Sequence, residues 1–120
     1  MSLLSEQFGG AAVALDVAVS EAYAVVVAPV DVQLYPDLGF YVQNQGADAL
    51  ESVIVETSPE ESGRPWVLVD EVAAAVASGA VAFGSLSAQA LKWIRIRAKC
   101  GAGDTATANF WLCAGGYGGG

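Results

Sequence analysis

Histidine is missing from this chain of 120 residues. Its absence removes the usual general base, the commonest zinc ligand and the base partner of a serine or cysteine nucleophile. Neighbouring acids such as Glu60 and Glu61, or Asp70 and Glu71, are poor substitutes, because adjacent side chains of a strand point to opposite faces. We therefore expect no catalytic residues, no cofactor and no enzyme; an enzyme of unidentified type is the least favoured interpretation.

Cysteine is also scarce, with only Cys100 and Cys113 present. The expected strand alternation places Cys100 on an inner face and Cys113 on an outer face, too far apart for a disulfide. We predict free thiols, as is usual in a reducing cytoplasm. The pair lacks CxxC spacing, so no metal site is expected from it. Asp31, Asp37 and Asp48 offer oxygen ligands for calcium, but no ligand-loop spacing matches.

Basic residues are few: five Lys and Arg stand against 13 Asp and Glu, which gives a formal net charge of −8. Such a charge repels phosphate backbones and anionic lipids, so we expect no nucleic-acid partner and no membrane partner. The longest apolar stretch, residues 11–30, is broken by Asp16, Glu21 and Pro29 and predicts no transmembrane helix. The first ten residues lack a basic start and a compact apolar run, so no signal peptide is expected.

Apolar residues make up 54% of the chain and charged residues only 15%, a composition typical of a folded protein. The length fits one domain. We predict an N-terminal arm over residues 1–10, a β-sandwich domain over 11–114 and a flexible glycine-rich tail over 115–120.

Period-two alternation of apolar residues and frequent turn residues predict an all-β fold. Short strands without crossover helices favour an antiparallel β-sandwich or jelly roll of about eight strands. The segment Asp70–Gly79 could form a short helix, but an irregular connection fits the surrounding strands better. The expected strand runs are Ala12–Val19, Tyr23–Ala28, Val30–Tyr35, Phe40–Asn44, Leu50–Thr57, Trp66–Val69, Ala80–Gly84, Leu91–Lys99 and Thr105–Ala114.

Two hairpins are expected among these runs. One joins Phe40–Asn44 to Leu50–Thr57, and the other joins Leu91–Lys99 to Thr105–Ala114 through glycine-rich turn residues. In the second hairpin Ile94, Ile96 and Ala98 would meet an apolar side formed by Ala106, Ala108, Phe110 and Leu112.

The outer side of that last hairpin is the candidate interface. It has two interpretations: cross-strand packing neutralised by neighbouring acids, or a docking face rich in the residue types of interaction hot spots. In the second case a basic patch would meet an acidic patch on an identical copy, which predicts self-association. The candidate residues are Trp93, Arg95, Arg97, Lys99, Asn109 and Trp111.

Four segments carry a resemblance to a known family. They are Phe40-Tyr41-Val42-Gln43-Asn44-Gln45-Gly46, Leu50-Glu51-Ser52-Val53-Ile54-Val55-Glu56, Trp66-Val67-Leu68-Val69 and Leu91-Lys92-Trp93-Ile94-Arg95-Ile96-Arg97-Ala98. In this order, over roughly Leu34–Leu112, the chain resembles the small β-sandwich head decoration (cement) proteins of tailed bacteriophages. The shared features are packing patterns, so no active-site residues carry over.

The resemblance implies a virion structural protein, made in the host cytoplasm and located on the capsid surface. It would bind the major capsid protein and identical copies, commonly as a homotrimer, and stabilise the shell. The alternative is a carbohydrate- or receptor-binding β-sandwich module of a phage tail or fibre, in which exposed Tyr and Trp residues stack on sugar rings. An aromatic row on one exposed sheet face would favour that alternative.

Overall fold

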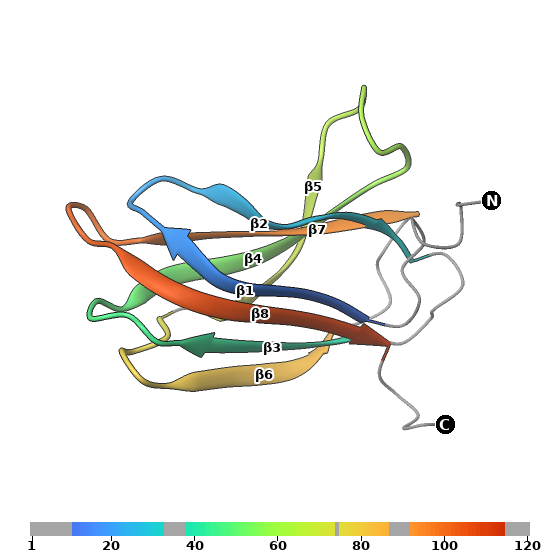
Figure 1. The fold of residues 1–120 in the computed structure, drawn as a ribbon. Helices are drawn as coiled ribbons and strands as arrows, with labels where there is room; N and C mark the ends of the chain where they lie inside the picture. The colour runs from blue at the N-terminus through green and yellow to red at the C-terminus, as the bar shows by residue number, and fades with distance from the viewer. Residues whose placement is uncertain (1–10, 33–37, 74, 87–91, 115–120) are drawn as a thin grey trace.

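The protein is a sandwich of two four-stranded antiparallel sheets, which confirms the expected fold class (Figure 1). The computed structural model describes residues 11–32, 38–73, 75–86 and 92–114, so the predicted arm and tail lie outside the described residues. Sheet A has the order β1-β8-β3-β6 and sheet B the order β2-β7-β4-β5. The strands are β1 (Ala11–Val19), β2 (Ala24–Asp31), β3 (Leu38–Asn44), β4 (Leu50–Ser58), β5 (Val67–Ala73), β6 (Val81–Leu86), β7 (Trp93–Cys100) and β8 (Ala106–Ala114).

The strand pairs are nested, which makes the sandwich a jelly roll. Strand β1 pairs with β8, β2 with β7, β3 with β6 and β4 with β5, all antiparallel. The chain therefore behaves as one long antiparallel ribbon that is folded over itself, and only the innermost pair, β4 and β5, joins two consecutive strands within one sheet. Every other connection crosses between the sheets.

The core lies between the sheets and follows the alternation predicted for the last two strands. Ile94, Ile96 and Ala98 are fully buried on the inner side of β7, opposite the fully buried Phe110 and Leu112 of β8. The inner-face prediction is thus confirmed. The rest of the core consists of the buried apolar side chains Val19, Val26, Val27, Val32, Leu38, Phe40, Val42, Leu50, Val53, Val55, Val76, Cys100, Ala106 and Ala108.

The predicted break at Pro29 is wrong, because β2 runs through this residue to Asp31. A proline has no N–H to donate and is tolerated only at a strand edge or a bulge. Strand β2 is an edge strand of sheet B, and its register against β7 shifts between Val27 and Val30. Pro29 therefore costs the sheet no necessary ladder bond.

The predicted hairpin of Phe40–Asn44 with Leu50–Thr57 is also wrong, because β3 lies in sheet A and β4 in sheet B. The buried Asn44 bends the chain between the sheets: its Oδ1 accepts the N–H of Gly46, and its Nδ2 donates to the carbonyls of Asp48 and Val76. Gly46 is required because a Cβ there would lie 2.6 Å from the Ala106 Cα.

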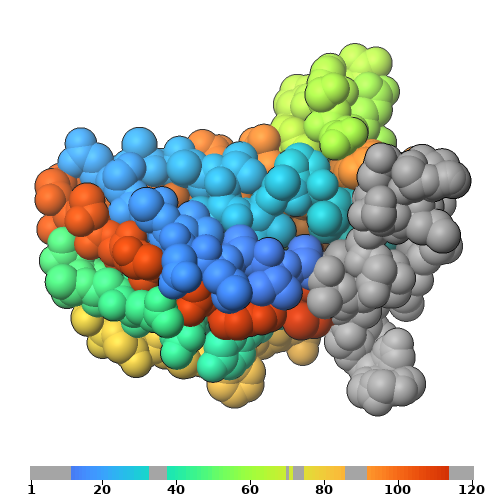
Figure 2. Space-filling view, in the orientation of Figure 1, coloured from blue at the N-terminus to red at the C-terminus, as the bar shows by residue number. Residues whose placement is uncertain are grey.

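The connection between β4 and β5 projects from the body of the sandwich (Figures 1 and 2). It contains two prolines and three acid or base residues that are exposed, as the sequence predicts for this loop. After β5, Val76 forms an isolated bridge with Leu50, and the described part of Asp70–Gly79 contains no helix. The helical alternative is thus not found in the described part, but the predicted irregular connection is right only from Ala75 on, because β5 extends over Asp70–Ala73.

Candidate functional site

The six candidate interface residues do not form one surface. Trp93, Arg95, Arg97 and Lys99 lie on the outer side of β7 in sheet B, whereas Asn109 and Trp111 lie on β8 in sheet A. The predicted hairpin of these strands is wrong: β7 pairs with β2 and β4, and β8 pairs with β1 and β3. The apolar sides of the two strands face each other across the core, which gives the same alternation as a hairpin but places the outer sides on opposite faces of the sandwich.

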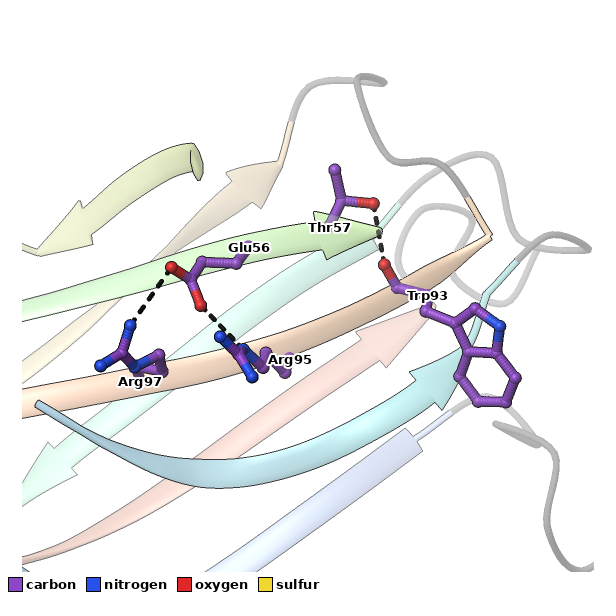
Figure 3. Close-up of polar contacts among 5 residues, drawn as sticks. All are labelled: Glu56, Thr57, Trp93, Arg95 and Arg97. Carbon is purple, nitrogen blue, oxygen red and sulfur yellow. Dashed lines mark hydrogen bonds and ion pairs between the residues drawn. The ribbon is translucent and has the colours of Figure 1, made fainter. Parts of the chain in front are cut away.

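On sheet B, the basic side chains of β7 are held by acids of β4. Arg95 lies opposite Glu56 in register, and its Nε–H donates to Glu56 Oε1 at 2.7 Å (Figure 3). Arg97 approaches the other carboxylate oxygen of Glu56 at 3.4 Å. At the end of the same strand pair, the Thr57 hydroxyl donates to the Trp93 carbonyl at 2.8 Å. One buried carboxylate thus orders two arginines.

Aromatic rings complete the basic row on sheet B. The Arg95 guanidinium lies 4.4 Å from the centre of the Trp66 ring, at the base of the projecting loop. Arg97 and Lys99 lie 5.3 and 5.2 Å from the Tyr23 ring centre. All three distances are in the range of cation–π attraction. The arginines are therefore fixed between an acid on one side and a ring on the other.

Three further polar contacts extend this network over sheet B. The Tyr23 hydroxyl donates to Ser52 Oγ at 2.8 Å, and the Ser52 hydroxyl donates to Glu71 Oε2 at 2.9 Å. The Lys99 ammonium contacts Glu51 Oε1 at 2.9 Å, and this hydrogen bond, with the charge of Glu51, raises the pKa of Lys99 above its usual value. Strands β7, β4 and β5 are thereby joined to each other and to Tyr23, which directly precedes β2, across the outer face of sheet B.

All five Lys and Arg residues of the chain are ion-paired. The remaining two pairs are Arg64 with Glu60 at 3.4 Å and Lys92 with Asp31 at 3.7 Å. The interpretation of the basic row as neutralised cross-strand packing therefore fits the geometry. The expected attraction between this row and an acidic patch of another copy loses its physical basis, because the acids that neutralise the row belong to the same chain.

The outer face of sheet A has the opposite chemistry. The register places Val13, Trp111, Tyr41 and Phe83 side by side, one from each strand, in a row that crosses the whole sheet. Phe83 is 75% exposed and Val13 53% exposed. The Tyr41 and Trp111 rings meet edge to face with centres 5.1 Å apart. A shallow hollow of about 420 Å³ beside them is lined by Tyr41, Gln43, Trp111 and Cys113. Leu15, where the β1 register shifts, and Val81, opposite Gln43, are also exposed.

The strands of the two sheets differ strongly in their number of charged residues. The four strands of sheet A contain a single charged residue, Asp16. The strands of sheet B contain eight, namely Asp31, Glu51, Glu56, Asp70, Glu71, Arg95, Arg97 and Lys99. We call this outer side of sheet A, on which Val13, Leu15, Tyr41, Val81 and Phe83 are exposed and Trp111 is half-buried, the apolar face.

Asn109, one of the candidate interface residues, is occupied within the chain and only 5% exposed. Its Oδ1 accepts the backbone N–H of Asp16 at 2.7 Å, and its Nδ2 donates to Gln43 Oε1 at 3.1 Å. Asp16 has a positive φ of 55° and lies where the β1 register shifts. Asn109 therefore holds the β1 bulge in place, a role that no local pattern indicated.

The two cysteines are free, as predicted. Cys100 is buried, and its S–H donates to the Val19 carbonyl oxygen, 3.6 Å from Sγ. Burial, with the charges of Asp104 and Asp48, raises the pKa of its thiol. Cys113 is half-buried at the hollow of the apolar face.

Among the residues that the structure describes, no three His, Cys, Asp or Glu side chains gather to hold a metal ion. The described part of the chain also contains no helix long and apolar enough to span a membrane.

Comparison with known proteins gives no matching family model and no matching curated protein. Among solved structures, the PBSX exported protein XepA matches with a TM-score of 0.66 and 14% identity over 88% of this chain. This chain spans 36% of XepA. PirA matches with a TM-score of 0.59 and 14% identity, over 82% of this chain and 90% of PirA. A chain of the rhinovirus-B5 structure matches with a TM-score of 0.44 and 7% identity, over 88% of this chain and 64% of the rhinovirus chain. This TM-score is too low to indicate a shared fold. Because the sequence identity is only 14%, the likeness to XepA and PirA shows a shared fold and nothing more.

Proposed function

We propose that this protein is a virion structural protein that binds the outer surface of a phage capsid and stabilises it, as a decoration or cement protein does. Its partners in this proposal are the major capsid protein and identical copies, and it catalyses no reaction. The observation that carries the proposal is the apolar face. On a chain with a net charge of −8, one sheet has eight charged residues in its strands and the other has one.

A surface of this kind favours a protein partner. Monomeric proteins rarely expose large continuous apolar patches, and such patches usually mark interaction sites. The exposed side chains combine aromatic residues with the aliphatic Val13, Leu15 and Val81. Aliphatic and aromatic residues together are typical of the buried centre of a protein interface, where charged residues are depleted. A capsid surface that covers this face would remove it from water.

The fold supports the proposal only by analogy. Jelly rolls are common among viral capsid proteins and also among lectins. Since one fold can have many functions, the assignment depends on the surface and on the sequence resemblance to head decoration proteins. The homotrimer that this resemblance implies is part of the proposal.

The test is co-sedimentation of the purified chain with capsids of the phage that encodes it, prepared without the chain. The variant Val13→Ser removes an apolar side chain from the apolar face, and Val25→Ser is the matched control. Val25 is 45% exposed and lies opposite Arg97 on the outer side of sheet B, against 53% for Val13. We expect Val13→Ser to weaken capsid binding and Val25→Ser to leave it unchanged.

A second measurement addresses stabilisation. Capsids carrying the chain should survive heating and osmotic shock that rupture capsids without it. Equal survival of both particles, or equal binding by the two valine variants, would contradict the proposal.

A carbohydrate-binding module is the second candidate, and one observation favours it. Trp111, Tyr41 and Phe83 form an aromatic row on the outer face of sheet A, which favours such a module, with the hollow and the Gln43 amide beside it. Aromatic faces can stack on sugar rings, and an amide can hydrogen-bond hydroxyl groups. Binding to a panel of neutral oligosaccharides that is lost in Trp111→Ala and kept in Trp93→Ala would favour this candidate over capsid decoration.

A further inference from the structure

The four edge strands of the sandwich differ in how they are protected against pairing with another chain. An open edge presents unpaired backbone donors and acceptors, and natural sheets block it with charges, prolines or bulges. Strand β1 has the bulge at Asp16. Strand β2 has Pro29 and two register shifts, and β5 has Asp70, Glu71 and two register shifts.

Strand β6 has none of these devices. Its six residues, Val81–Leu86, include no charged residue and no proline. Its register against β3 is continuous from Leu38 opposite Leu86 to Gln43 opposite Val81. The strand forms the outer edge of sheet A, and no other strand of the described residues lies beside it there (Figure 1). Among the four edge strands, β6 is therefore the one whose edge is open to pairing with another strand.

The backbone groups that face this edge follow from the pairing with β3. The Asn44 N–H donates to the Ala80 carbonyl at 3.0 Å, just before the strand begins. Hydrogen-bonded positions alternate along an antiparallel ladder. The groups of Ala82, Gly84 and Leu86 thus point to β3, and those of Val81, Phe83 and Ser85 point to the open edge. These three residues are exposed, and the described part of the chain gives their backbone groups no partner.

We propose that β6 pairs antiparallel with β6 of a second copy across a two-fold axis at Phe83, so that two sheets A join into one sheet of eight strands. Phe83 then lies opposite its own counterpart, and Val81 lies opposite Ser85 in both directions. Each hydrogen-bonded pair exchanges two bonds, so the contact contains on the order of six inter-chain backbone hydrogen bonds.

Charge and side-chain pattern favour a second copy as the occupant. Two chains with a net charge of −8 each repel one another, and they can approach best where their surfaces have no charge. Neither β6 nor its neighbour β3 contains a charged residue. The pairing also continues the row of Val13, Trp111, Tyr41 and Phe83 into the same row of the second copy, which shields both exposed phenylalanine rings. An extended segment of a different protein is the competing occupant.

The contact is isologous and closes at two chains. The dimer does not rest on capsid binding, but it is an alternative to the homotrimer that the sequence resemblance implies and that the proposed function includes. The absolute mass in solution therefore separates the two: the chain mass is 12.2 kDa, and the proposal requires twice that value.

The experiment is sedimentation equilibrium of the full chain over a wide range of concentrations, with three variants. Ser85→Pro removes an N–H that faces the open edge and leaves the ladder to β3 intact, whereas Ser85→Ala keeps that N–H and is the matched control. Phe83→Lys places like charges opposite each other across the two-fold axis, although it lowers the net charge of each chain. Circular dichroism and thermal unfolding establish that every variant folds.

We expect wild type and Ser85→Ala to form dimers with the same Kd, and Ser85→Pro to raise the Kd by about tenfold or more because two symmetry-related donors are lost. Phe83→Lys should be monomeric. A monomeric or trimeric wild type, or a dimer that persists in folded Ser85→Pro and Phe83→Lys, would overturn the proposal. Capsid co-sedimentation of Ser85→Pro distinguishes the dimer proposal from the capsid-binding proposal. This variant removes the strand pairing but leaves the apolar side chains used for docking unchanged.

Discussion

Glu56 and Arg95 face each other on neighbouring strands, and the Glu56 carboxylate accepts the Arg95 Nε–H at 2.7 Å although the residues are 39 positions apart. The side chains are 10% and 20% exposed, so water screens the contact less than it screens a surface pair. This ion pair explains why a row of arginines on a small domain needs no external partner.

Replacing Glu56 should therefore weaken the sandwich more than replacing an exposed acid. Glu56→Gln removes the charge that holds Arg95 and Arg97, and we expect a loss of about 2 kcal/mol in the free energy of unfolding. Urea denaturation measures the loss, and Glu61→Gln on the exposed loop is the control, expected to remain within about 0.5 kcal/mol of wild type. Equal effects of the two substitutions would show that the network contributes little to stability.

Two phenylalanines give a second test, because they have the same chemistry on opposite sides of sheet A. Phe110 is fully buried, and Phe83 is three-quarters exposed. We expect Phe110→Ala to cost about 3–5 kcal/mol, since it removes buried surface and leaves a cavity. Phe83→Ala should change stability by no more than about 0.5 kcal/mol when measured at low protein concentration. A large loss for Phe83→Ala under these conditions would mean that Phe83 packs within the monomer.

Strand identity and the inner faces of β7 and β8 could be predicted from the sequence, because a period of two is a local property. Ile94, Ile96 and Ala98 alternate with exposed neighbours whether their strand pairs with β8 or faces it across the core. Alternation therefore indicates which side of a strand is buried but not which strand lies beside it. Both predicted hairpins are wrong for this reason, and so is the single surface predicted to contain Arg95 and Trp111.

The contacts that shape the two faces could not be predicted from the sequence, for the same physical reason. Asp16 and Asn109 are 93 positions apart, and their hydrogen bond forms only because β1 and β8 are the outer pair of the nested ribbon. The frequency of proline in turns predicts a strand end at Pro29. Its tolerance depends on the edge position of β2, which is a property of the sheet order.

The two cysteines should differ strongly in reactivity. Cys113 is half-buried at the hollow of the apolar face, whereas Cys100 is buried and has a raised thiol pKa. Because the thiolate is the reactive form, a disulfide reagent at pH 8 should modify one thiol in the folded protein and two in urea. The variant Cys113→Ser should lose the fast reaction, and Cys100→Ser should keep it. Fast modification of Cys100 in the folded chain would contradict the burial described for it.

The raised pKa of Cys100 also gives a pH dependence with a defined sign. The folded thiol ionises at a higher pH than the unfolded thiol, so the unfolded state loses its proton first as the pH rises. The contribution to stability is complete below the ordinary thiol pKa and is lost as the pH rises through the folded value. Unfolding free energies of wild type should therefore fall more steeply above about pH 8.5 than those of Cys100→Ala. Parallel curves for the two proteins would contradict this linkage.

Asn109 should be needed for the shape of the apolar face. Its Oδ1 holds the Asp16 N–H at the bulge after which β1 regains its register with β8. Asn109→Ala leaves this N–H and the Gln43 Oε1 without their partner, and we expect a loss of about 1–3 kcal/mol in unfolding free energy. Thr107→Ala, on an exposed outward position of the same strand, is the control and should be close to neutral. Amide hydrogen exchange at Asp16 and Val17 gives a local measurement: faster exchange there in Asn109→Ala, with the rate at Ile96 in β7 changed less, is the expected result. Uniformly faster exchange across both sheets would instead assign Asn109 to global stability alone.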